Sequence, residues 1–232
     1  MMKKDKTPAI QLITGDAPFE FSEAYKALRT NFNFVSRNGE NRKVLITSTI
    51  PNEGKTSVAI NLAISLVQTG KRVLLVDADM RNPSLHIYLN LKRDRERGLS
   101  SILMTGMPLE EAIVETLHGF DVIHGGPIPP NPVELVSSKD MQMLLDSAVE
   151  RYDYVICDAP PVGIVTDAAA LSTLCDGVLF VVRQKMGKKS QVMGAVHRLQ
   201  SVNAKILGVI FNHYDMSDVS EKEYGYYSSY AK

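Results

Sequence analysis

A lysine and a threonine stand side by side at the end of a short loop, in a pattern suited to hold nucleotide phosphates. The loop reads Thr-Ile-Pro-Asn-Glu-Gly-Lys-Thr over residues 49–56, and it joins the apolar run 43–48 to a helical pattern. Gly54 lets backbone N–H groups close around phosphate oxygens, while a helix starting near Lys55 directs its positive end at the same charge. Lys55 is expected to contact the β- and γ-phosphates, and the Thr56 hydroxyl to ligate Mg²⁺. The loop therefore predicts an Mg-ATP site.

One position departs from the usual phosphate-loop pattern, because Thr49 stands where that pattern has its first glycine. The alternative is a helix start that contains Gly-Lys-Thr and binds no ligand. The order of strand, loop and helix favours the nucleotide site. The residues predicted to bind the nucleotide are Thr49, Pro51, Asn52, Glu53, Gly54, Lys55, Thr56 and Ser57.

Three aspartates directly follow apolar runs of the chain. Asp77 and Asp79 come after the run at 72–76, and Asp158 comes after the run at 153–157. The carboxyl ends of parallel strands meet at one edge of a sheet, where ligands of such folds bind. We therefore expect these carboxylates to converge with the phosphate loop.

The carboxylates suit the chemistry of phosphate transfer. Mg²⁺ takes one or two carboxylates together with phosphate oxygens and water, so Thr56, Asp79 and Asp158 are predicted to hold the metal, directly or through water. Asp77 is predicted to accept or orient the proton of the nucleophile, although the sequence also permits Asp77 and Asp79 to exchange roles or to cap the following turn. Arg81 is placed to stabilise phosphate charge or to pair with an acid.

Apolar runs alternate with amphipathic stretches along most of the chain. Strands are predicted at 43–48, 72–76, 120–124, 153–157, 177–183 and 205–211. The alternation predicts an α/β fold with a doubly wound, mainly parallel sheet flanked by helices, of the P-loop NTPase class. We expect a single domain over 1–232, with a lead-in at 1–20 and a mobile tail at 214–232. A proline-rich loop at 125–132 is predicted to shape the rim of the site or an interface.

The composition excludes several classes of protein. The chain carries 26 basic and 26 acidic side chains in 232 residues, so no overall field attracts it to nucleic acid. No apolar run approaches the roughly 20 residues that cross a bilayer, and the charged start lacks a signal-peptide core. Cys157 and Cys175 are predicted to be reduced thiols. These features predict a cytoplasmic protein.

An amphipathic helix is predicted over 22–36. Its apolar positions recur at helical spacing and are Phe21, Tyr25, Leu28, Phe32 and Val35. Glu23, Lys26 and Arg29 fall roughly opposite on the helical wheel. This charged set is either a solvated face or a contact between subunits.

Tyrosines cluster at the end of the chain. Four of the nine lie within the last nine residues, at Tyr224, Tyr226, Tyr227 and Tyr230. Their neighbours are Gly and Ser rather than aliphatic residues, so the segment cannot bury its rings within itself. Exposed rings invite association, which indicates a specific use. A tail whose rings pack on a neighbouring subunit is the alternative.

The phosphate loop, the segment Leu-Leu-Val-Asp-Ala-Asp-Met-Arg at 74–81 and Val-Ile-Cys-Asp-Ala-Pro-Pro at 155–161 together resemble the cytoplasmic domain of bacterial tyrosine kinases. The resemblance covers about 20–230. It implies a tyrosine autokinase in which Asp77 and Asp79 contribute to metal binding and catalysis, and the tail tyrosines are the autophosphorylation sites. It also implies that Asn212 lies near the adenine, although a cap at a strand end is the competing interpretation.

The resemblance extends to partners. Glu23, Lys26 and Arg29 resemble the family's Glu-x-x-Arg-x-x-Arg oligomerisation motif, with lysine in place of the first arginine, and we expect a ring-like homo-oligomer. A membrane-anchored activator, tyrosine-containing protein substrates, a location at the inner face of the membrane through a partner, and control of capsule or exopolysaccharide synthesis are implied by the family alone. Related assembly ATPases carry an additional lysine that 48–51 lacks. A nucleotide-switched assembly ATPase and a module that uses ATP only structurally are the competing functions.

Overall fold

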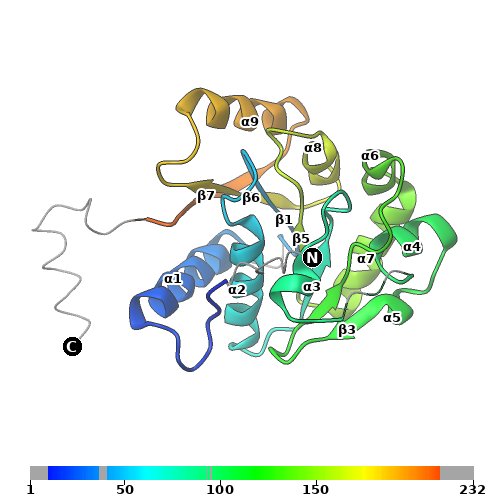
Figure 1. Cartoon of the computed structure of the whole chain (residues 1–232), viewed down its shortest axis with the longest axis horizontal. Coiled ribbons are helices and arrows are strands. Elements are labelled where there is room, and N and C mark those ends of the chain that lie inside the picture. Colours follow the sequence, from blue (N-terminus) through cyan, green and yellow to red (C-terminus); the bar gives the residue numbers. More distant parts are fainter. Residues whose placement is uncertain (1–9, 37–40, 93, 95, 215–232) are drawn as a thin grey trace, which may run out of the picture.

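The computed structural model describes residues 10–36, 41–92, 94 and 96–214. Its centre is a seven-stranded sheet of order β3-β4-β2-β5-β1-β6-β7 (Figure 1). Neighbouring strands are parallel except for β3, which pairs antiparallel with β4 at one edge. The strands are β1 Lys43–Ser48, β2 Val73–Asp77, β3 Ile113–Glu115, β4 Asp121–Ile123, β5 Tyr154–Asp158, β6 Gly177–Arg183 and β7 Ile206–Asn212.

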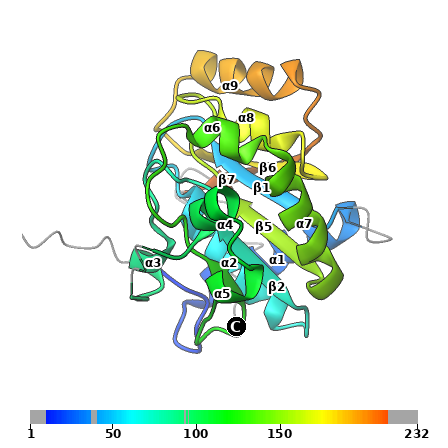
Figure 2. The ribbon, with the colours of Figure 1, turned by 90° about the vertical axis from the view of Figure 1, so that its right-hand side faces the viewer.

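Helices cover both faces of the sheet, as Figures 1 and 2 show. The helices are α1 Phe19–Val35, α2 Lys55–Val67, α3 Leu85–Tyr88, α4 Leu99–Thr105, α5 Leu109–Ala112, α6 Pro132–Val136, α7 Lys139–Arg151, α8 Asp167–Ser172 and α9 Lys189–Ser201. α1 and α2 pack on one face, and α7, α8 and α9 pack on the other. Successive strand residues point to opposite faces, so Leu45 joins one apolar cluster while Val44 and Ile46 join the other. Strands that are apolar on both faces therefore produce a three-layered core.

The predicted strands are found: β2, β5 and β7 are displaced by one residue, and β4 is one residue shorter at each end. β1 and β6 have the predicted bounds, whereas β3 was not predicted because three residues at an antiparallel edge leave too short a pattern. The helix predicted over 22–36 begins earlier, at Phe19, and ends at Val35. Cys157 and Cys175 are free thiols, as predicted.

The lead-in is attached to the core from residue 10 onward. Ile13 is buried, and its N–H donates to Asn61 Oδ1 of α2 at 2.8 Å. Asn61 Nδ2 donates in turn to the Gln11 carbonyl at 2.9 Å. This side chain thus binds an extended segment through the same groups that a neighbouring strand would use.

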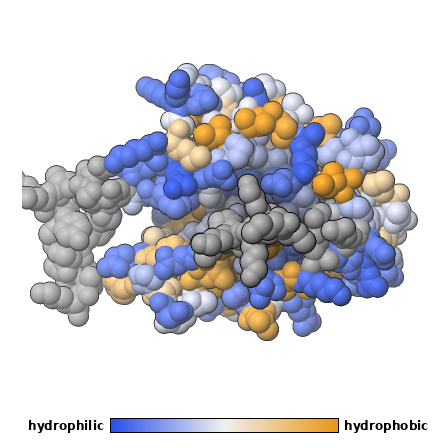
Figure 3. All heavy atoms as spheres, in the orientation of Figure 1, coloured by the Kyte–Doolittle hydropathy of each residue, from blue (hydrophilic) through white to orange (hydrophobic). Residues whose placement is uncertain are grey.

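The helices in the part of the chain that the structure describes include no candidate for a membrane span. None of the helices there combines the length and the apolar composition that a bilayer crossing requires. On the face shown in Figure 3, hydrophobic residues form separate groups among hydrophilic ones.

Candidate active site

Three strands bring the predicted catalytic residues to one edge of the sheet. β5 lies between β1 and β2, and its last residue, Asp158, is in register with Asp77 of β2 and Ile46 of β1. The loop 49–54 continues from β1 at the same edge and leads into α2. The convergence predicted from strand ends is therefore present in the structure.

Lys55 is the first residue of α2 and lies at the centre of the cluster. Its Nζ is 3.3 Å from Asp79 Oδ2 and 3.4 Å from Asp158 Oδ1. The Thr56 hydroxyl donates to Asp158 Oδ2 at 2.6 Å. These side chains are buried or nearly so, which strengthens each charge interaction. One ammonium, one hydroxyl and two carboxylates thus occupy the positions where phosphate and metal chemistry was predicted.

The site concentrates negative charge in a dry environment. Burial opposes the charge of Lys55, but Asp158, Asp79 and Asp77 together outweigh it and raise the pKa of the ammonium. Burial also raises the pKa of Asp158, although Lys55 and Thr56 act in the opposite direction. A cationic ligand or an additional proton would relieve the repulsion between these carboxylates.

Asp77 differs from the other two aspartates in its contacts. Its Oδ2 accepts the backbone N–H groups of Ser84 at 3.0 Å and Leu85 at 3.1 Å. Its Oδ1 is buried and has no hydrogen-bond partner. Burial and the nearby charge of Asp158 raise the pKa of Asp77 to about 7. A buried, fixed carboxyl group with a free oxygen and a pKa near neutrality has the properties of a general base.

The phosphate loop is shaped by left-handed residues at its centre. The described loop adopts positive φ at Asn52 (67°) and Gly54 (91°), but Thr49 does not. Because Thr49 needs no glycine-like conformation, the departure from the usual pattern costs the loop no backbone strain. Pro51 and Asn52 form the exposed tip of the loop.

Glu53 has a role that the motif did not reveal. Its carboxylate is fully buried and accepts the backbone N–H groups of Thr49 at 2.6 Å and Ile50 at 2.9 Å. Its carbonyl oxygen accepts the Asn212 side chain at 2.9 Å. Glu53 was predicted to bind the nucleotide, and in this structure its carboxylate holds the loop in a closed shape. Only the presence of an acid in a phosphate-binding loop signalled this role.

Substituting Gly54 with alanine should damage the loop in two ways. A Cβ there would collide with Asn212 Nδ2, and the φ of 91° disfavours any side chain. We expect ATP affinity to fall by about tenfold or more, as measured by titration with a fluorescent ATP analogue. Gly70→Ala is the matched control, because Gly70 also has positive φ but a Cβ added to it would meet no atom within 4 Å. Equal affinities of the two variants would contradict the packing argument.

Arg81 does not join the cluster. It forms a two-pronged ion pair with the buried Asp167, with Nε and Nη2 at 3.0 and 3.1 Å from the two carboxylate oxygens. The sequence allowed Arg81 either to stabilise phosphate charge or to pair with an acid, and in the structure it pairs with an acid. This pair fastens the segment after β2 to the start of α8.

The residues predicted at a subunit contact lie on α1. Lys26 and Glu23 pair with each other at 2.7 Å on the exposed side of the helix. Arg29 instead donates to the Ser65 carbonyl at 2.7 Å and to its hydroxyl at 3.2 Å within the same chain. Ser57 faces α1, where its side chain hydrogen-bonds to Tyr25. The tail tyrosines Tyr224, Tyr226, Tyr227 and Tyr230 lie outside the described residues.

Comparison with known proteins assigns the family. Residues 50–214 match the family model described as an AAA domain. The tyrosine-protein kinase YwqD of Bacillus subtilis is 41% identical to this chain over 209 residues, which cover 90% of the chain and 86% of that protein. The chain belongs to the bacterial tyrosine kinases. The resemblance stated from the motifs is therefore confirmed.

Solved structures agree with this assignment of the kinase. The crystal structure of the chimerical protein CapA2B2 superposes with a TM-score of 0.79 at 36% identity and covers 86% of each chain. The septum site-determining protein MinD of Pyrococcus horikoshii, complexed with Mg-ADP, gives a TM-score of 0.64 at 25% identity and covers 76% of the kinase and 72% of that chain. The predicted P-loop NTPase fold is thus confirmed.

Proposed function

We propose that the kinase transfers the γ-phosphate of Mg-ATP to the tyrosines at its own C-terminus, from one copy to another. The observation that carries this proposal is the position of Lys55 at a helix start, between two buried carboxylates and beside the phosphate loop. Phosphate transfer depends mainly on positioning and charge compensation, and this cluster supplies both.

The donor groups fit a magnesium ion. Thr56 Oγ1 and the carboxylates of Asp79 and Asp158 are oxygen ligands, which Mg²⁺ prefers, and they lie together at the end of the phosphate loop. MinD, whose structure contains Mg-ADP, supports the same ligand here. When bound, the ion neutralises charge on the phosphates. Lys55 then exchanges its carboxylate partners for the β- and γ-phosphate oxygens.

Asp77 is the proposed base. Asp79 is assigned to the magnesium ion, whereas Asp77 Oδ1 has no hydrogen-bond partner and is free to accept a proton. A tyrosine hydroxyl has an ordinary pKa of about 10, so it benefits from a nearby acceptor. The tyrosine oxygen bonds to the γ-phosphorus, the bond from that phosphorus to the bridging oxygen breaks, ADP leaves, and Asp77 takes the phenolic proton.

Transfer between copies can be tested by mixing two variants. One is Lys55→Met with an intact tail, and the other is active but carries phenylalanine at the four tail tyrosines. With γ-labelled ATP, we expect label on the tail of the Lys55→Met copy, mapped by mass spectrometry. The Lys55→Met protein alone is the control and should remain unlabelled. An unlabelled tail in the mixture would contradict transfer in trans, and label released only as free phosphate would indicate a nucleotide-switched ATPase.

The proposed partners follow from the family and from α1. The kinase is proposed to form a ring-like homo-oligomer through the face that carries Glu23 and Lys26, with Arg29 exchanging its contact with Ser65 for one with a neighbour. We further propose a membrane-anchored activator that brings the kinase to the membrane, Asn212 near the adenine, and a role in capsule or exopolysaccharide synthesis. Label transferred between copies in the mixture above requires that copies meet.

A further inference from the structure

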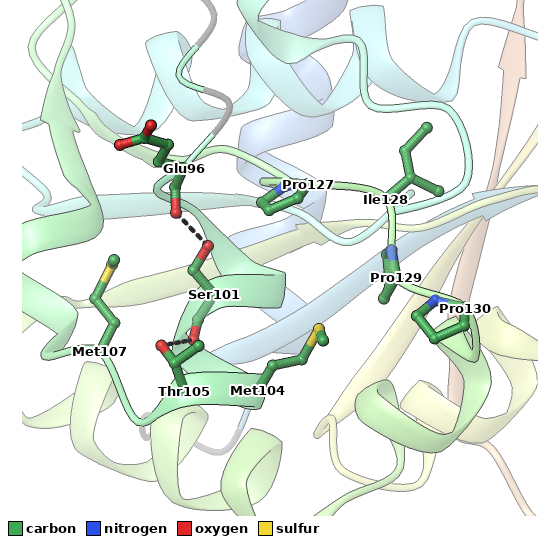
Figure 4. A pocket seen from close by; sticks show the side chains of 9 residues that line it. All are labelled: Glu96, Ser101, Met104, Thr105, Met107, Pro127, Ile128, Pro129 and Pro130. Carbon is green, nitrogen blue, oxygen red and sulfur yellow. Dashed lines mark hydrogen bonds between the residues drawn. The ribbon is translucent and has the colours of Figure 1, made fainter.

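An apolar groove lies outside the catalytic cluster. It encloses about 460 Å³ between the end of α4 and the proline-rich loop that follows β4. Figure 4 shows the two methionines on the helix side and the residues of the proline-rich loop along the other side. The apolar side chains that line the groove are Met104, Met107, Pro127, Ile128, Pro129 and Pro130.

The two walls of the groove are fixed to each other by hydrogen bonds. The N–H of Leu99 donates to the His124 carbonyl at 2.7 Å, and the N–H of Ser100 donates to the Gly125 carbonyl at 3.1 Å. The Ser100 hydroxyl also donates to the Pro127 carbonyl at 2.7 Å. The groove is thus formed in advance, so a ligand would not have to order its walls.

The chemistry of the walls suits aromatic rings. Met104 and Ile128 leave 56% and 60% of their surface exposed, so apolar atoms face outward. Methionine sulfur makes favourable contacts with ring edges, and prolines offer flat apolar faces. Among the described residues that line the groove, only Glu96 is charged. An uncharged tyrosine fits such a surface, while a phosphotyrosine, with about two negative charges, does not.

The groove begins beside the catalytic edge. A Cβ at Gly125 would lie 2.9 Å from the Pro83 ring and 3.5 Å from the Asp77 carbonyl, so the loop starts against the segment that follows β2. The loop that forms one wall of the groove, from Pro127 onward, therefore begins two residues after a contact with Asp77. One tyrosine of a cluster could reach the phosphate while a neighbouring one is held in the groove.

The C-terminal segment is long enough to reach the groove. β7 ends at Asn212 on one side of the sheet, and five strand intervals of about 4.8 Å separate β7 from β4. That is a distance of about 24 Å. Residues 215–232 span about 60 Å when fully extended, which exceeds this distance. The proposed transfer between copies makes a neighbouring copy the source of the segment.

We propose that this groove binds a tyrosine of segment 224–230 from a neighbouring copy while another tyrosine of that segment is phosphorylated. The proposal rests on the proposed function and names a second contact for the same substrate. A tyrosine that has been phosphorylated carries about two negative charges and cannot then bind between apolar walls and Glu96, so the tail leaves as its tyrosines are modified.

Peptide binding tests the groove without any phosphate transfer. The full chain, with serine at its four tail tyrosines, is titrated into a fluorescent peptide of residues 221–232 in the absence of Mg-ATP, and anisotropy is measured. Met104→Glu should weaken binding by about tenfold or more, because a charge replaces an apolar contact to a ring. Met143→Glu on α7 is the matched control, since Met143 is 62% exposed and does not line the groove.

The outcomes separate the groove from the catalytic proposal. Loss of affinity in Met104→Glu but not in Met143→Glu, with weaker binding of the phosphotyrosine peptide, supports the groove. No binding to the starting protein, or equal affinities of the two variants, would overturn it. Because no transfer is measured, a protein that binds the peptide but never phosphorylates it would contradict the proposed function while leaving the groove supported.

Discussion

Lys55→Met should abolish transfer of labelled phosphate to tyrosine, with a loss of about a thousandfold or more. The ammonium lies within 3.4 Å of both Asp79 and Asp158, and it is the charge placed to neutralise the β- and γ-phosphates. Methionine keeps the length of the side chain but provides neither charge nor a donor. Label from γ-labelled ATP, mapped to individual tyrosines, measures the effect.

The same substitution also leaves two buried carboxylates without their cation, so the fold must be checked alongside activity. We expect a lower thermal midpoint, since uncompensated buried charge is costly. Lys43→Met is the matched control. Lys43 also pairs with an acid, Asp146, at 2.9 Å, but it is the first residue of β1 and lies at the opposite end of that strand from the site. Lys43→Met should keep its labelling. Labelling retained in Lys55→Met would refute the proposed mechanism.

Asp77→Asn should lose transfer by about a hundredfold or more, the range expected when a general base is removed. The amide oxygen of asparagine can still accept the N–H groups of Ser84 and Leu85, so the turn after β2 keeps its support. The amide cannot accept a proton from tyrosine at neutral pH. Initial rates of tyrosine labelling, at saturating Mg-ATP, report the loss, and a rate equal to that of the wild type would exclude Asp77 as the base.

The difference in stability between the wild type and Asp77→Asn should change with pH in a defined direction. The pKa of Asp77 is about 7 in the folded protein, against an ordinary value of 3.8, so the stability linked to this group is lost progressively as pH rises from about 4 to about 7. Asparagine does not titrate. The measurement is the thermal midpoint of each protein without nucleotide or Mg²⁺. The midpoint of the variant minus that of the wild type should be larger at pH 8 than at pH 5.5, values that lie on either side of about 7. A difference that stays constant would argue against a raised pKa.

The catalytic cluster could be predicted from the sequence because the carboxyl ends of parallel strands always lie at the same edge of the sheet. Asp77 and Asp158 each close an apolar strand, and pairing of those strands places them in register. The strands themselves were readable from continuous apolar runs. β3 was missed because its three residues carry no period that distinguishes them from a loop.

Contacts between distant residues could not be predicted in the same way. Arg81 meets Asp167 and Arg29 meets Ser65, and in both pairs the partner lies on a separate element. Neither partner is marked by spacing or composition, because any of several exposed acids or carbonyls would satisfy an arginine equally well. The buried carboxylate of Glu53 is a local case, but a motif records residue types rather than the atoms that they bind.

The contacts of the Asn61 side chain determine where a stable fragment of the kinase should begin. This side chain holds the Ile13 N–H and the Gln11 carbonyl, both upstream of α1. A fragment cut at the start of α1 would remove the Ile13 N–H from Asn61 Oδ1, at a cost of about 1–3 kcal/mol if that oxygen is left unsatisfied, while Nδ2 keeps its bond to the Ser57 carbonyl. It would also uncover the apolar site of Ile13. The practical boundary for expression therefore lies before Ile10, although the first helix starts nine residues later, at Phe19.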